Sequence, residues 1–112
     1  MTELTALRLY FPHSARVKPT RFWHHLSAPA LSQHLLTAAR RSGIDQVLLM
    51  SAHAGYLPGK RLSHQHPEST PAHHPLCLEL LDIEDRLRKF LHEHADELRH
   101  VRAVFFKCEM AI

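Results

Sequence analysis

The chain has 112 residues, of which 45% are hydrophobic and 22% charged, and its formal net charge is +3. This length and composition predict a single globular domain spanning residues 1–112, and the interleaving of acidic with basic residues argues against nucleic-acid binding. No apolar run approaches the ~20 residues of a membrane helix and the N-terminus has no signal-peptide pattern, so we expect a cytoplasmic protein that is not membrane-embedded.

An alternating pattern over residues 4–11 predicts the first strand, with two leucines and Phe11 on one side and Ala6, Arg8 and Tyr10 on the other. Residues 12–28 contain two prolines and little periodicity, which indicates a long connection with Phe22 and Trp23 as anchors on the core.

Leucines recurring at helical spacing predict a helix that begins near Pro29. Ser27 is a candidate N-cap and Gly43 a candidate C-cap glycine. The apolar run that follows, within residues 45–56, predicts a second strand that ends in small residues.

Residues 57–75 are rich in proline and histidine and predict a long mobile loop without regular structure. Residues 76–81 then predict a third strand. Asp82 is expected to cap a second helix, with a buried stripe that runs from Ile83 to Leu98. Residues 101–110 predict the last strand. The cysteines, Cys77 and Cys108, fall in strands and are expected to be buried thiols.

This order predicts an α+β, ferredoxin-like βαββαβ fold: a four-stranded antiparallel sheet with both helices on one face. Three strands are apolar at odd and even positions alike, which is typical of strands buried on both sides. Because two helices cover only one face, we expect the other face to be buried in a homo-oligomer.

The loop base, residues 55–61, contains two glycines whose N–H groups can approach an anion, with two cations beside them. This combination suits a phosphate group, although the glycines could equally serve only to turn the chain. The candidate ligand-binding residues are Gly55, Tyr56, Gly59, Lys60, Arg61 and His53, with Arg102 and Lys107 on the last strand as second-rank candidates.

Twelve histidines are the compositional anomaly, and four of them, His64, His66, His73 and His74, lie in the proline-rich loop. Imidazole is a good ligand for zinc, copper or nickel, so a divalent metal site in the loop is an alternative to solvated histidines. His92 and His94 are two residues apart on the second helix and are expected to be exposed.

On the second strand, Ser51, His53 and Asp45 alternate on one face and are the candidate catalytic groups. Nothing supplies the donors that an oxyanion would need. The acidic run from Glu79 to Asp85 is more simply a strand end and a helix start. We therefore expect no enzyme.

Three stretches resemble the PII-like signalling superfamily, in particular a compact branch of it: residues 38–44, the turn Ala54-Gly55-Tyr56 with residues 59–64, and residues 75–90. The resemblance implies a homotrimer with adenine nucleotide (AMP, ADP or ATP) bound between subunits. It also implies that the 57–75 loop controls a partner protein, such as a transporter.

The sequence departs from the family pattern at Leu57, where that turn usually has a glycine, and in the long 12–28 connection. Two rival hypotheses stand beside the nucleotide sensor. One is a metal-homeostasis protein that uses the loop histidines, and the other is an interaction module without a ligand.

Overall fold

A computed structural model describes residues 3–17, 28–66 and 68–112, so the predicted Ser27 cap and the Phe22 and Trp23 anchors lie outside the described residues. Its elements are, in chain order, β1 (Leu4–Pro12), α2 (Leu31–Arg41), β2 (Gln46–Ser51), β3 (Ala54–Gly55), β4 (Ser63–His64), β5 (Pro75–Asp82), α3 (Glu84–Glu93) and β6 (Arg102–Cys108).

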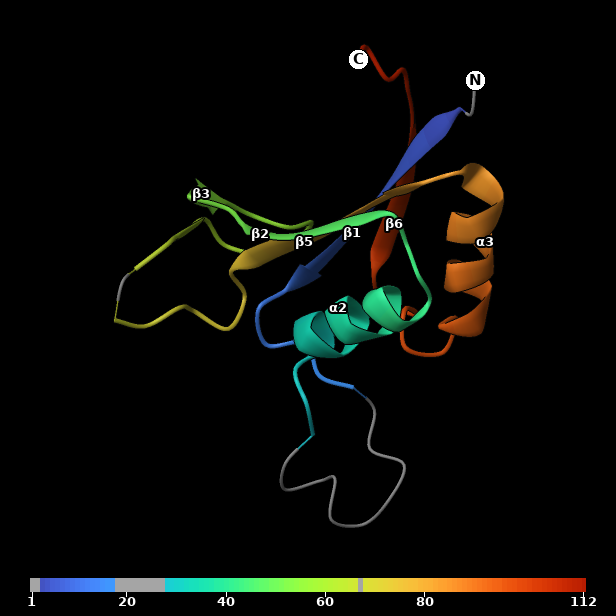
Figure 1. Ribbon diagram of the computed structural model, residues 1–112. Helices are drawn as coiled ribbons and strands as arrows, with labels where there is room; N and C mark the ends of the chain where they lie inside the picture. Colours follow the sequence, from blue (N-terminus) through green and yellow to red (C-terminus); the bar gives the residue numbers. More distant parts are fainter. Residues whose placement is uncertain (1–2, 18–27, 67) are drawn as a thin grey trace.

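The main sheet has four strands in the order β2-β5-β1-β6, and every neighbouring pair is antiparallel. α2 packs on β2 and β5, whereas α3 packs on β1 and β5. Both helices lie on one side of the sheet, and none of the described elements covers the other side (Figure 1). This confirms the predicted α+β, ferredoxin-like fold.

The core lies between the sheet and the two helices. Leu7, Leu9 and Phe11 of β1 are buried there, as the alternating pattern predicts. They meet the leucines of α2 at helical spacing and Leu87 and Phe90 of α3. Gly43 ends α2 with φ +74°, the left-handed conformation that favours glycine at this position.

The start of α3 differs from its prediction. The N-cap position is Ile83, without a side-chain cap, and Asp82 has another role. The Asp82 carboxylate accepts hydrogen bonds from the backbone N–H of Asp45 (2.9 Å) and of Ile83 (2.7 Å) and lies 3.3 Å from the Arg86 guanidinium. Asp82 therefore ties the start of β2 to the junction of β5 and α3.

The segment from residue 57 to 75 is more regular than predicted. β3 and β4 form a small hairpin beside the main sheet, with Ala54 opposite His64 and Gly55 opposite Ser63. The chain reverses through Leu57-Pro58-Gly59-Lys60, where the Lys60 N–H donates to the Leu57 carbonyl (3.0 Å) and Gly59 has φ +74°. Proline followed by a positive-φ glycine is typical of a type II turn. Pro58, one of the prolines that predicted an irregular loop, thus helps to close a hairpin.

Candidate functional site

The uncovered face of the sheet, called the open face below, carries apolar and charged side chains in rows across the strands. The cross-strand pairing places Leu48, Glu79, Arg8 and Val104 in one row. Leu48, Met50 and Phe106 are exposed by 47%, 37% and 42%. The predicted second apolar face is therefore present.

An ion pair occupies the middle of this face. Arg8 Nε donates to Glu79 Oε2 at 2.8 Å, and the Arg8 guanidinium lies 5.0 Å from the centre of the Phe106 ring. The Tyr10 hydroxyl and the Glu79 carboxylate raise the pKa of Arg8 above its ordinary value, so this side chain is a permanent cation.

A hollow of about 400 Å³ lies where the open face meets the β3–β4 hairpin. We call it the Tyr56 hollow. Its size is within the range of small-molecule sites. Its lining residues are Arg8, Tyr10, Met50, Ser51, Ala52, Gly55, Tyr56, Leu57, Pro75, Leu76 and Cys77. Partial burial raises the pKa of the Cys77 thiol, so a neutral thiol stands beside the Arg8 cation.

The structure brings together only part of the predicted phosphate site. Gly55 and Tyr56 line the hollow, and Arg102 is placed next to it by pairing with Tyr10 on the open face. The remaining members of the predicted site, Gly59, Lys60, Arg61, His53 and Lys107, lie outside its lining.

Gly59 and Lys107 lie in two different parts of the structure, outside the lining of the Tyr56 hollow. Gly59 belongs to the turn of the hairpin, which is the turning role left open by the sequence. Lys107 pairs with Thr5 on the helix side of the sheet and lines a hollow of about 700 Å³ at the start of α3. That hollow also contains Glu3, Glu84, Asp85 and Glu109, so it is a poorer place for an anion.

Sequence reasoning missed Arg8, Tyr10, Met50 and Cys77 as lining residues. The alternation of residues 4–11 already places Arg8 and Tyr10 on the side opposite the core. This alternation does not predict the position of the β3–β4 hairpin, which closes one end of the hollow.

His74 has a role that its sequence position does not suggest. Its side chain is fully buried, with Nδ1 2.7 Å from Ser63 Oγ and Nε2 2.7 Å from the Ala52 carbonyl oxygen. Because the carbonyl can only accept, Nε2 donates to it and Nδ1 accepts from the hydroxyl. His74 therefore fastens β4 and the end of β2 to the start of β5, and both of its nitrogens are in use.

The other loop histidines do not converge. His64 and His66 are exposed and His73 is half-buried. Among the described residues, the only group of three donors with metal-site spacing is His34, His94 and Glu97, far from this loop in sequence. The placement of the four loop histidines gives no support to the predicted metal site.

Comparisons with known proteins agree with the fold. The model of the DUF190 family, described as "Uncharacterized ACR, COG1993", matches residues 5–110. No curated protein matches the chain significantly.

Two solved structures share its fold. A protein described as PII-like and signalling, from Thermus thermophilus, superposes with a TM-score of 0.54 at 14% identity, covering 96% of this chain and 86% of that one. CPII of Thiomonas intermedia, a nitrogen regulatory PII-like protein, gives a TM-score of 0.57 at 10% identity, with the same coverage. CPII was solved with ADP and bicarbonate, and also with ADP, AMP and bicarbonate.

Within the described residues, no helix is both long enough and apolar enough to cross a membrane.

Proposed function

Since the chain belongs to the DUF190 family and has a PII-like fold, we propose that it is a regulatory protein and not an enzyme. In this proposal three copies assemble through their open faces and bind an adenine nucleotide between subunits. The 57–75 segment then reports the occupancy of the site to a partner protein.

The Tyr56 hollow is the observation that carries this proposal. Its lining includes the apolar side chains of Met50, Leu57 and Leu76, which suit a base or a sugar. Cations lie around it: Arg8 in the lining and Arg102 in the same cross-strand row as Tyr10. A phosphate group needs such donors. The nucleotide complexes of CPII favour the same ligand class for this chain.

The proposed trimer would bury the apolar side chains of the open face. Three large side chains on this face are more than a third exposed: Leu48, Met50 and Phe106. An exposed apolar surface of this kind is typical of an interaction site. Arg8 and Glu79 are already paired, so covering them leaves no isolated charge.

The hairpin supplies the proposed link between ligand and partner. Tyr56 is 68% exposed in the loop that connects β3 to β4, and Lys60 and Arg61 of the same loop are also exposed. A nucleotide that contacts Tyr56 would restrain the exposed loop of the hairpin, and ligand-dependent ordering of a loop is a common means of signalling.

Isothermal titration calorimetry with AMP, ADP and ATP tests the proposal, each with and without bicarbonate. We expect saturable binding of at least one nucleotide. Tyr56→Ala and Arg102→Ala should each weaken it by about tenfold or more, because each removes a ligand contact. Lys89→Ala is the matched control, since Lys89 is 77% exposed on α3. Absence of heat with all three nucleotides at high protein concentration would overturn the proposal.

A further inference from the structure

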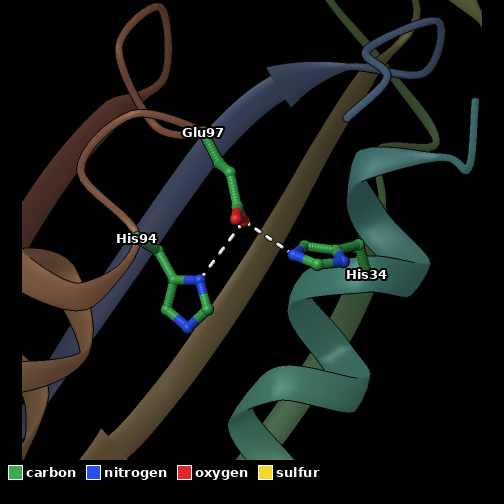
Figure 2. Close-up of side chains that lie close together, drawn as sticks. All are labelled: His34, His94 and Glu97. Atoms are coloured by element: carbon green, nitrogen blue, oxygen red, sulfur yellow. Dashed lines mark hydrogen bonds and ion pairs between the residues drawn. The ribbon is translucent and has the colours of Figure 1, made fainter. Parts of the chain in front are cut away.

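A second group of polar side chains lies on the helix side of the sheet, between α2 and the end of α3. His34 of α2, His94 at the C-cap of α3 and Glu97 in the following turn point toward one another (Figure 2). Glu97 Oε2 lies 2.7 Å from His34 Nε2 and 3.2 Å from His94 Nδ1. All three donor atoms lie within 4.8 Å of one another.

The end of α3 fixes two of the three side chains. The His94 ring packs against Phe90, with a centroid distance of 4.5 Å, and the side chain is only 16% exposed. The Leu98 N–H donates to the His94 carbonyl (3.1 Å), which continues the turn and brings Glu97 back over the histidine. The expectation that His94 is surface-exposed is therefore wrong, because the helix ends at Glu93 and the chain folds inward.

His34 Nε2 is the least satisfied atom of the group. It is buried and, among the residues that the structure describes, has no hydrogen-bond partner of good geometry, although Glu97 Oε2 is only 2.7 Å away. A buried nitrogen without a partner is costly. A ligand placed among the three side chains would satisfy it.

We propose that His34, His94 and Glu97 form a binding site for a divalent transition metal, with zinc as the probe of choice. Two imidazoles and one carboxylate are a common zinc ligand set, whereas calcium and magnesium prefer oxygen ligands alone. Ligands around tetrahedral zinc lie about 3.3 Å apart. The His94–Glu97 separation of 3.2 Å matches this spacing, and His34 and Glu97, at 2.7 Å, would move slightly apart to admit the ion. Three protein ligands leave a fourth position open to water or a further ligand.

Zinc at this position would join α2 to α3 and stabilise the layer that covers the core. This inference is independent of the proposed nucleotide site, because its residues lie on the opposite side of the sheet. It also differs from the loop-histidine hypothesis, since it uses none of those four residues.

Competition with a chromophoric chelator measures zinc affinity without nucleotide. We expect wild-type protein to bind one tight zinc per chain and to melt roughly 10 °C higher at a hundredfold excess of zinc over its dissociation constant. His34→Gln, His94→Gln and Glu97→Gln should each lower the affinity at least tenfold. Cobalt(II) should give the visible absorption of a tetrahedral site in wild type and lose it in these variants.

Two controls separate this site from the other histidines. His92→Gln changes an exposed histidine on the same helix, and a triple variant, His64→Gln, His66→Gln and His73→Gln, removes the accessible loop histidines. Both should retain wild-type affinity, with circular dichroism confirming that every variant is folded. Unchanged zinc affinity in the three site variants, or loss of the tight zinc in the loop triple variant, would overturn the inference.

Discussion

Single side chains determine how the hairpin and the open face meet the core. Buried polar groups matter most here, because each one has a small number of partners that no other group can replace. His74 and Asp82 are the informative cases, because the sequence predicts a metal ligand at the first and a helix cap at the second.

Replacing His74 should loosen the attachment of the hairpin. His74→Phe keeps a ring of similar size but leaves Ser63 Oγ and the Ala52 carbonyl without their partner, and we expect a loss of about 2–3 kcal/mol in the free energy of unfolding. Urea denaturation measures this loss. The Gln65 N–H donates to the His53 backbone carbonyl, and its hydrogen exchange should also accelerate.

His66→Ala is the matched control for this prediction, because His66 is an exposed histidine of the same segment. It should change stability by less than about 0.5 kcal/mol. Equal stability of the two variants would contradict the role assigned to His74.

The two cysteines should differ in reactivity. Cys77 is half-buried with a raised pKa, whereas Cys108 is exposed. Because the thiolate is the reactive form, iodoacetamide at about pH 8 should alkylate Cys108 first. A nucleotide in the Tyr56 hollow should slow Cys77 further and leave Cys108 unchanged. Mass spectrometry of the two tryptic peptides gives both rates, and equal rates would contradict the environment described for Cys77.

At the scale of elements, the sequence predicts the framework well. The period of two in β1, the helical spacing in α2 and the apolar runs of β2 and β5 depend on local patterning. For that reason these elements lie within a few residues of their predicted positions.

The hairpin and the two side-chain clusters could not be predicted in the same way. β3 and β4 have two residues each and depend on the contacts of His74 from the segment that leads into β5. The approach of His34 to His94 joins two helices that are distant in sequence. The exposure of Cys108, which was expected to be buried, likewise follows from its place at the end of an edge strand.

The turn of the hairpin offers a test at this scale. Gly59→Ala puts a side chain at φ +74° and should cost about 1–2 kcal/mol of hairpin stability. Gly55→Ala is the control, because Gly55 has no positive φ and an added Cβ there meets open space. Hydrogen exchange across residues 54–64 should accelerate in the first variant alone. Acceleration in both, or in neither, would contradict the turn geometry.

For the whole molecule, the central claim is that the open face is closed by other copies of the chain. Both helices of the described residues lie on one side of the sheet (Figure 1). The other side carries exposed apolar side chains around the Arg8–Glu79 ion pair. Shared nucleotide sites between subunits require this closure.

A charge on the open face should therefore separate the subunits. Leu48→Glu would place a second carboxylate opposite Glu79 in the cross-strand row and should give a folded monomer. Arg99→Glu, a change at an exposed residue after α3, should leave the assembly intact. A trimer that survives Leu48→Glu would place the interface elsewhere.

Sedimentation of the wild-type protein at micromolar concentration tests the central claim most directly. We expect one species of three times the 12.9 kDa chain mass. A stable, well-behaved species of 12.9 kDa would contradict it, because the open face would then be exposed to solvent and no site between subunits could form.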